Sequence, residues 1–318
     1  MTERIAILDL GTNTFNIFIA ELHPEKSFQK IYKSKIAVKL GEGGINNNHI
    51  QEMPFRRGIR AIKKHKRTCK KFGAEKIYAF ATSAIRSADN GKDFVKEAKE
   101  KTGIDITVIS GEREAELIYF GVRSAVQMND SPSLIIDIGG GSTEFIIATK
   151  DKVLWKHSFL LGAARLLEKF RPSDPITASE AKQIENYLEE NLKPLFLAVD
   201  TLSPKGGGPG KGLELIGSSG SFDSLAEMIA YRFYDIDILK GKTEYDFNLQ
   251  DCQKMYDIIL RSTTKERMHM KGLTKMRVDM IVVSAIFVDY IMLRLGLKRM
   301  RLSKYSLKEG ALWELMNG

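Results

Sequence analysis

The chain is poor in cysteine, and this scarcity excludes two classes of small, cross-linked protein. Its 318 residues include only two cysteines, Cys69 and Cys252, and neither lies in a Cys-x-x-Cys pair. A disulfide framework or a structural zinc site needs more cysteines at closer spacing. The five histidines show no ligand-like spacing either. We therefore expect a protein of the reducing cytoplasm.

Long apolar runs are also missing. The longest lies at 280–288 (MIVVSAIFV) and ends at Asp289, which makes it too short to span a bilayer. The first residues, MTERIAILDLG, carry Glu3 and Asp9 around a short apolar stretch. A signal peptide has a basic start and a longer apolar core. The sequence therefore predicts a soluble protein without a membrane partner.

What is present is an ordinary globular composition with an excess of positive charge. Hydrophobic residues make up 43% and charged residues 28%, which are usual values for a globular protein. A chain of 318 residues is long enough to form two domains. The formal net charge is +9, which favours an anionic partner without choosing among nucleic acid, phosphate-rich metabolite or membrane surface.

The basic run from Arg56 to Lys71 is the densest part of this charge. It holds nine Lys and Arg and no acidic or interleaved aromatic residue. Base stacking on single-stranded nucleic acid needs aromatic side chains. We favour a solvated helix face over a polyanion track and expect no specific nucleic-acid partner.

Strand-like and helix-like patterns alternate along the chain. Strands are expected at 4–11, 16–22, 31–40, 76–81, 105–110 and 213–217, and a strand–turn–strand pattern restarts at Leu134. Helices are expected at 54–72, at 111–126 with Ser110 as N-cap, at 177–191 with Thr177 and Glu180 as capping box, and over most of the chain after a Ser/Gly turn at 218–221. This alternation indicates an α/β protein.

Two segments share one plan. IAILDLGTNTFNIFIAE (5–21) and LIIDIGGGSTEFIIATK (134–150) both read as an apolar strand, Asp-x-Gly, small hydroxyl or amide residues, and a second apolar strand. One such turn could arise by chance, but two in equivalent positions indicate an internal repeat. The echo predicts two similar domains, each presenting a hairpin turn.

The residue types in these turns are suited to phosphate. Glycine leaves backbone N–H groups unshielded by Cβ atoms, and such groups can form a concave anion site. Hydroxyl and amide side chains add further donors. The candidate phosphate-binding residues are Gly11, Thr12, Asn13, Thr14, Gly139, Gly140, Gly141, Ser142 and Thr143.

Carboxylates flank the second turn. Asp137 and Glu144 lie on its opposite strands, and they would repel a phosphate unless a divalent cation lay between. Mg²⁺ held by one or two carboxylates, waters and phosphate oxygens is the usual arrangement. Asp9 occupies the matching place in the first copy. We therefore expect a Mg²⁺ or similar divalent cation near Asp9, Asp137 and Glu144.

Three other features admit two interpretations each. Arg86, in ATSAIRSADNG (81–91), can grip a phosphate bidentately or form a surface salt bridge. Glu112 and Glu114 can stabilise a helix N-terminus, or one of them can act as a general base. The segment GGGPGKG (206–212) has the wrong spacing for a Walker A loop and lacks Ser or Thr after Lys211, so we interpret it as a mobile loop.

Together the segments resemble the exopolyphosphatase / guanosine pentaphosphate phosphatase (Ppx/GppA) family, in a short two-domain form, within the actin-like ATPase superfamily. Any one of them is weakly specific, whereas nine in family order are strongly so. They are DLGTNTFNIFIAE, KLGEGG (39–44), ATSAIRSADN, VISGEREAELIYFGV, LIIDIGGGSTEF, LLGAARLLEKF, IGSSGSFDSLAEM (216–228), MRVDMIVVSAIFV and SLKEGALWE.

The resemblance implies an α/β fold of two actin-like (RNase H-like) domains with a cleft between them. The domains would span 1–126 and 127–303, and the C-terminal helix 304–318 would return to the first. The implied activity is metal-dependent release of the terminal phosphate of inorganic polyphosphate, with the 5′ γ-phosphate of pppGpp as the alternative. The anionic partner would be one of these substrates, and a homodimer is left open.

The resemblance also implies residue roles. It places the catalytic glutamate at Glu114 rather than Glu112, the metal and water-positioning carboxylates at Asp137 and Glu144, and phosphate-binding groups in the two turns and at Arg86. Thr12 and Thr14 stand where serines are usual and keep the hydroxyls. Arg113 stands where an acid is frequent, so we expect it to lower the pKa of Glu114.

Two alternatives to a phosphatase remain at this point. A kinase of the same superfamily would need an adenosine pocket, for which the SSGS segment (218–221) is the only candidate. A non-enzymatic actin-like or regulatory protein would need no general base beside the turns.

Overall fold

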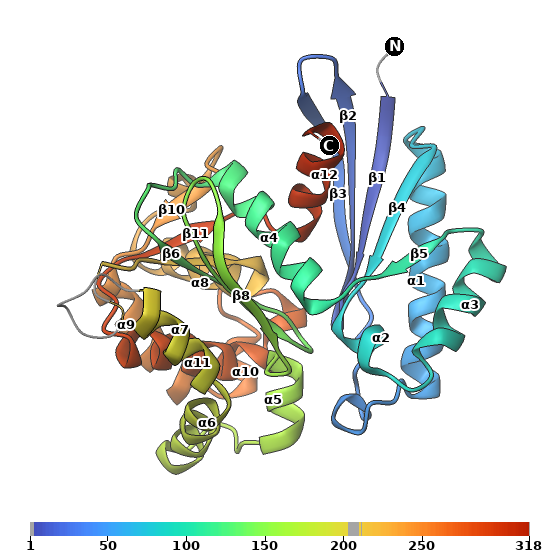
Figure 1. Cartoon of the computed structure of the whole chain (residues 1–318). Coiled ribbons are helices and arrows are strands. Elements are labelled where there is room, and N and C mark those ends of the chain that lie inside the picture. Colours follow the sequence, from blue (N-terminus) through green and yellow to red (C-terminus); the bar gives the residue numbers. More distant parts are fainter. Residues whose placement is uncertain (1–2, 203–209, 211, 318) are drawn as a thin grey trace.

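The computed structural model describes residues 3–202, 210 and 212–317, which form two β-sheets with helices around and between them (Figure 1). The segment 203–209 and Lys211, which include most of the expected mobile loop, lie outside the described residues. The first sheet has the strand order β3-β2-β1-β4-β5. Its strands are β1 (Glu3–Leu10), β2 (Thr14–His23), β3 (Ser27–Ala37), β4 (Lys76–Ala81) and β5 (Ile106–Val108).

The second sheet repeats this plan. Its order is β10-β11-β9-β6-β7-β8. Its strands are β6 (Ser133–Ile138), β7 (Thr143–Ala148), β8 (Val153–Phe159), β9 (Leu215–Ser218), β10 (Glu244–Asp246) and β11 (Met300–Ser303). In both sheets three antiparallel strands are followed by two parallel ones, and β10 extends the second sheet at its edge. The duplication that the sequence echo predicted is therefore confirmed, and so is the α/β class.

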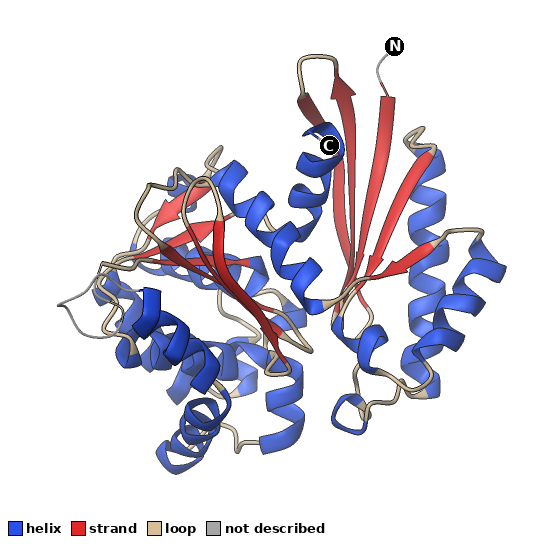
Figure 2. Ribbon diagram, in the orientation of Figure 1, coloured by secondary structure: helices blue, strands red, loops and turns tan. Residues whose placement is uncertain are grey.

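Helices occupy most of the remaining described chain (Figure 2). They are α1 (Glu52–Lys71), α2 (Ser83–Ser87), α3 (Gly91–Thr102), α4 (Gly111–Ala125), α5 (Ala163–Phe170), α6 (Ala178–Asn191), α7 (Lys193–Leu202), α8 (Ser219–Phe233), α9 (Leu249–Arg261), α10 (Thr264–Arg267), α11 (Met280–Arg294) and α12 (Leu307–Asn317), with short 3₁₀ turns η1 (Ile45–Asn47), η2 (Ile236–Leu239) and η3 (Lys275–Arg277).

The two-residue period of the strands divides their apolar side chains between two cores. On β1, Leu8 packs with α1 and α3, whereas Ile7 packs with α4 and α12. On β6, Ile136 joins the core under α8 and α11, whereas Ile135 joins the core shared with α4 and α12. Helices α4 and α12 therefore lie between the two sheets and pack against both (Figure 1).

Several local predictions are confirmed. The Ser110 hydroxyl accepts from the Arg113 N–H at the start of α4, and Thr177 with Glu180 forms the capping box of α6. The SSGS segment, however, is not a turn, because Ser218 ends β9 and Ser219 begins α8. Helices α3, α5 and α7 and strands β8, β10 and β11 were not predicted. In α3 the apolar pattern is thin, since Phe94, Val95 and Ala98 stand among charged residues.

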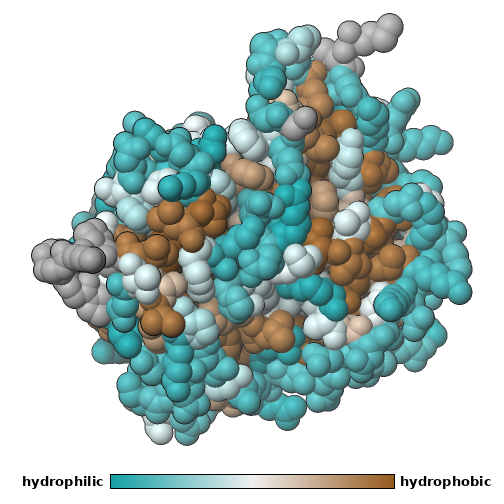
Figure 3. All heavy atoms as spheres, in the orientation of Figure 1, coloured by the Kyte–Doolittle hydropathy of each residue, from teal (hydrophilic) through white to brown (hydrophobic). Residues whose placement is uncertain are grey.

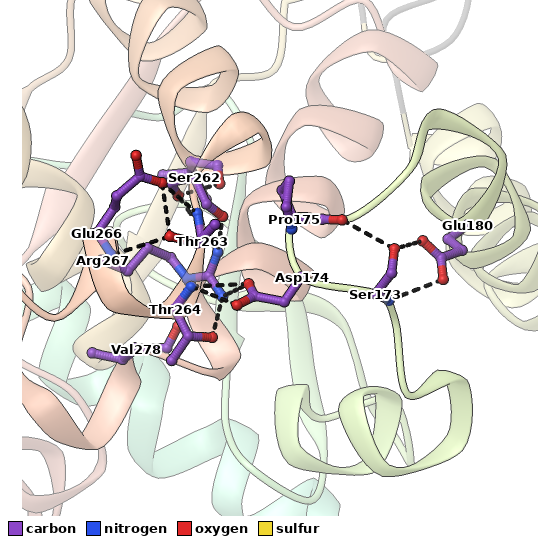
Figure 4. Close-up of polar contacts among 11 residues, drawn as sticks. Ser173, Asp174, Pro175, Glu180, Ser262, Thr263, Thr264, Glu266, Arg267 and Val278 are labelled. Carbon is purple, nitrogen blue, oxygen red and sulfur yellow. Dashed lines mark hydrogen bonds and ion pairs between the residues drawn. The ribbon is translucent and has the colours of Figure 1, made fainter.

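A buried arginine ties the second half of the chain together. Arg267, 4% exposed, donates to the Val278 carbonyl (3.0 Å) and to Asp174 (2.9 Å), while the Thr264 N–H also donates to Asp174 (Figure 4). These contacts fix the segment after α10 against the loop that leads into α6. That segment carries Arg277 toward the cleft described below.

The surface is that of a globular protein. Hydrophilic residues cover most of the face in Figure 3, and apolar areas lie between them. Within the described residues, none of the helices is long and apolar enough to cross a membrane.

Candidate active site

The two predicted turns face each other across one cavity between the sheets. The cavity is lined by Gly11–Thr14 from the first turn and Gly139–Ser142 from the second. The turns are nearly in contact: a Cβ atom built on Gly141 would lie 2.4 Å from Thr12 Oγ1 and 2.7 Å from Ser83 Oγ. Only glycine fits there, so the close approach of the turns explains its presence.

The peptide groups of the second turn are oriented for an anion. The Gly139 carbonyl accepts from Ala163 N (2.9 Å), and the Gly140 carbonyl accepts from Ala164 N (2.9 Å) and Arg165 N (3.2 Å). In a trans peptide the following N–H points the opposite way. The N–H groups of Gly140 and Gly141 therefore point away from α5, and no acceptor for them is found among the described residues.

The first turn has the same orientation. The Thr12 carbonyl accepts from Leu40 N (2.7 Å), and the Asn13 carbonyl accepts from Val38 N and Lys39 N (2.9 Å each). The N–H that follows the Thr12 carbonyl, that of Asn13, is directed to the other side. In both turns the carbonyls accept hydrogen bonds from neighbouring segments of the chain, and the N–H groups that follow them point to the opposite side. An anion-binding turn needs N–H groups that are free in this way.

Two hydroxyls in the cavity lack hydrogen-bond partners within the described part of the chain. Thr12 is 4% exposed and Ser83 is 2% exposed, and neither hydroxyl has a partner. A buried hydroxyl left unpaired costs about 1–3 kcal/mol. A ligand oxygen beside Gly141 would satisfy both, so the pair indicates an anion position between the turns.

Four carboxylates surround this position. Asp9 accepts from Asn16 Nδ2 (2.9 Å), and Asp137 accepts from the Ser218 (2.7 Å) and Ser219 (2.6 Å) hydroxyls. Glu144 accepts from the Ser158 hydroxyl (2.7 Å). The fourth carboxylate is Glu114, and all four side chains line the cavity.

Burial raises the pKa of every one of these carboxyls. It raises the pKa of Asp9 to about 6 against the pull of Lys308 and Asn16. Burial and the charge of Asp137 raise the pKa of Glu144 to about 7. The pKa of Asp137 is also raised by burial, although the Ser219 and Ser218 hydroxyls oppose the shift. A nearby cation would favour the ionised carboxylates and so lower these pKa values.

Glu114 and Glu112 have different surroundings. Glu112 has an exposed side chain 3.7 Å from His157, where it can only complement the helix N-terminus. Glu114 is 8% exposed, faces the cavity, and is paired with Arg86 at 2.8 Å. Burial first, and then the charge of Glu144, raise the pKa of Glu114 well above its ordinary value.

The expected effect of Arg113 on Glu114 is wrong. Its guanidinium donates to Glu116 (2.7 Å) and to Glu314 on α12. It is therefore turned away from the cavity and neutralised, and the pKa of Glu114 is raised rather than lowered. Consecutive helix residues point about 100° apart, so adjacency in sequence did not imply proximity of the charges.

Two predicted phosphate-binding residues lie off the cavity wall. Arg86 donates to Glu114 and to the Ile109 carbonyl (3.0 Å) and is held behind that glutamate. The Thr143 hydroxyl donates to the Leu161 carbonyl (3.1 Å) and is fully buried. The structure brings the other predicted residues together around the cavity.

Sequence reasoning missed the cations of this cavity and the Ser83 hydroxyl. Lys33, Lys35, Arg277, Lys304 and Lys308 line it, and so does Ser83. Lys308 is 8% exposed and lies 3.2 Å from Glu309. The adjacent Lys308-Glu309 pair at the start of a terminal helix rich in apolar residues was the available signal for Lys308. Ser83 stands three residues before Arg86 in the same ATSAIR segment.

The donor set suits a divalent cation that takes only one or two of its ligands from protein carboxylates. Within the described part of the chain, no group of three or more His, Cys, Asp or Glu side chains converges as a metal cage. Asp9, Asp137 and Glu144 nevertheless line one cavity and have raised pKa values. These residues suit a Mg²⁺ ion held by one or two carboxylates, with waters and phosphate oxygens completing the shell.

The sequence of the chain matches the model of one protein family over most of its length. The model of the Ppx/GppA phosphatase family matches residues 18–318. Exopolyphosphatase 1 of Mycobacterium tuberculosis is 24% identical over 308 residues, covering 96% of this chain and 86% of that protein. A bifunctional 3-dehydroquinate synthase/phosphatase of Fusobacterium nucleatum is 35% identical over 200 residues, which are 60% of this chain but only 30% of that protein.

Solved structures agree. A crystal structure of an exopolyphosphatase from Cytophaga hutchinsonii has a TM-score of 0.92 at 36% identity, covering 99% of this chain and 98% of the other. A Ppx/GppA family member of Aquifex aeolicus has a TM-score of 0.78 at 23% identity, covering 100% and 98%. The family resemblance and the fold class predicted from sequence are confirmed.

Proposed function

The chain belongs to the Ppx/GppA phosphatase family, and on that premise we propose that it releases the terminal phosphate of inorganic polyphosphate by hydrolysis. The supporting observation is the pair of facing turns, where unpaired N–H groups and the free hydroxyls of Thr12 and Ser83 surround one anion position. Glu114 lies on the wall of the same cavity. The relatives described as exopolyphosphatases support the choice of substrate.

Glu114 would act as the general base. A water oxygen attacks the terminal phosphorus, the bridging P–O bond breaks, and its electron pair leaves with the shortened chain. The proton of the water passes to a Glu114 carboxylate oxygen. Burial suits Glu114 to this task because a raised pKa brings a carboxylate closer to the operating pH. Arg86 keeps its side chain oriented through their 2.8 Å contact.

The positive side chains would stabilise the phosphate chain. Lys35 and Arg277 line the cavity without an ion-pair partner in the described residues. Lys308, next to Asp9, offsets part of the carboxylate charge. When bound at Asp137, Glu144 or Asp9, a Mg²⁺ ion would neutralise charge on phosphate oxygens.

Replacement of the base tests the proposal. Glu114→Gln keeps the size and hydrogen-bonding shape of the side chain but removes the proton acceptor, so turnover of tripolyphosphate should fall at least about a hundredfold. Binding of tripolyphosphate, measured by calorimetry, should persist. Glu112→Gln, two residues earlier on an exposed part of α4, is the matched control and should keep the wild-type rate. Substantial hydrolysis by Glu114→Gln would exclude Glu114 as the base.

The guanosine substrate pppGpp is the second candidate. A groove that adjoins the cavity shares Lys33, Asp223 and Lys304 with it and includes Phe28 and Tyr305. Aromatic rings of this kind can stack on a nucleobase. Initial rates on tripolyphosphate, long-chain polyphosphate and pppGpp decide between the substrates. A higher kcat/KM for pppGpp than for either polyphosphate would make the nucleotide the preferred substrate.

A further inference from the structure

Each phosphate turn is supported from behind by another segment. The loop 38–41 donates its N–H groups to the Thr12 and Asn13 carbonyls. The first turn of α5 donates to the Gly139 and Gly140 carbonyls, and Arg165 Nε donates to the Gly141 carbonyl at 3.2 Å. Gly162 lies directly on the peptide between Gly140 and Gly141, where a Cβ would come within 2.4 Å. The orientation of both turns therefore depends on these two supports.

The two supports are joined to each other. Arg165 Nη1 donates to the Ile45 carbonyl at 2.7 Å and approaches Asn46 Oδ1 at 3.5 Å. Asn46 Nδ2 returns a hydrogen bond to the Arg165 carbonyl at 3.2 Å. The Gly43 N–H donates to Glu168 at 3.0 Å. Since Ile45 N is bonded to the Gly41 carbonyl (2.9 Å), the contacts run without a gap from one turn to the other.

The buried position of Arg165 is energetically unfavourable for a charged side chain. It is 8% exposed, its partners are carbonyl and amide oxygens, and its Nη2 has no partner within the described residues. Burial lowers the pKa of its guanidinium. Removing a charge from water without a carboxylate partner is unfavourable, and an apolar side chain of similar length would fill the space at lower cost. Packing alone does not account for an arginine at this position.

We propose that Arg165 is a positioning residue that sets the distance between the two phosphate turns. It does so by joining the Gly141 carbonyl to Ile45 and Asn46, which we call the clasp. The inference rests on the proposed phosphatase function, because the distance matters only if both turns bind the same phosphate. Its loss would leave each turn intact but let the cavity widen, and a misplacement of about 1 Å can cost about a hundredfold in rate.

The test compares variants on both sides of the clasp. Arg165→Met should lower kcat/KM for tripolyphosphate by about ten- to a hundredfold. Arg165→Lys keeps one donor and should recover part of this loss. Asn46→Ala removes the weaker, part-buried contacts and should lower kcat/KM about two- to tenfold. It serves as the second test of the clasp if Arg165→Met does not fold. Arg171→Met, at the exposed end of α5, should match the wild type.

Amide hydrogen exchange supplies a readout that a local packing role would not change. In Arg165→Met, exchange should accelerate about tenfold in the loop 38–47, which belongs to the other half of the molecule. Unchanged exchange there, or kcat/KM within twofold of the wild type, would overturn the proposal. If the wild type itself releases no phosphate, the proposed function fails, and the exchange measurement alone then decides whether the clasp exists.

Discussion

Glu114 illustrates how burial and charge oppose each other at a single residue. Burial and Glu144 disfavour the ionised carboxylate, whereas Arg86, 2.8 Å away, favours it. A base must be ionised to accept a proton, so the rate should fall as the pH drops through the raised pKa. With Glu114 as the proposed base, Arg86 would set the fraction of enzyme that is active near neutral pH, although it does not line the cavity.

Replacement of Arg86 gives a prediction with a definite sign. Arg86→Met removes the positive charge that favours ionised Glu114, so the pKa of Glu114 should rise further. The acidic limb of the pH profile of kcat/KM should move to higher pH, and the rate at pH 7 should drop. Arg113→Met is the control, because Arg113 is paired with Glu116 and Glu314. A limb that stays in place in Arg86→Met would contradict Glu114 as the titrating base.

Helices α4 and α12 connect the two sheets because they pack against strands of both. They cross at two glycines: a Cβ on Gly310 would lie 1.7 Å from the Leu117 carbonyl oxygen, and one on Gly121 would lie 2.2 Å from the Ser306 carbonyl oxygen. This contact lets α12 bury Leu312 between the sheets. It also brings Lys308, one turn earlier on α12, to the cavity.

Gly310→Ala should therefore affect both stability and activity. The methyl group would collide with backbone rather than with a flexible side chain, and overpacking of this kind costs about 1–3 kcal/mol or more. Thermal unfolding should show a lowered Tm. Phosphate release per folded molecule should also fall, because the displaced helix carries Lys308. Ser124→Ala, on the exposed face of α4, should change neither; an unaltered Tm in Gly310→Ala would mean that the helices can separate easily.

At the scale of the molecule, the cavity that would hold the proposed substrate lies between two halves of the chain. Besides the contacts of Arg165 and Asn46, loops of the two halves meet where Asn13 Nδ2 donates to the Met276 carbonyl (3.3 Å) and where Lys39 lies 3.7 Å from Asp279. The carboxylates contributed by both halves repel one another. A ligand that brings phosphate and a divalent cation should link the halves and stabilise the whole molecule.

This linkage can be measured without turnover. With Glu114→Gln, tripolyphosphate and Mg²⁺ together at about a hundred times Kd should stabilise the fold by about 2.7 kcal/mol and raise Tm. Chelation of the metal should remove most of the gain, since the phosphate would then face unneutralised carboxylates. An equal rise in Tm with and without the chelator would show that the anion binds without a metal.

Local patterns in the sequence were sufficient for the parts of the structure that form locally. The strand–turn–strand units around Asp9 and Asp137, the α/β class, the Ser110 cap and the Thr177 capping box all depend on residues a few positions apart. Backbone propensity, side-chain period and capping act over that range, so these features can be predicted from short windows.

Only the tertiary structure decided which side chains meet. It turned Arg113 away from the cavity and brought Ser83 and Lys308 to the cavity wall. It also joined Arg165 to Ile45 across 120 positions of sequence. Such contacts depend on how two sheets pack around α4 and α12. The chain alone determined that two similar glycine-containing turns exist, and packing determined the distance between them and the charges that surround them.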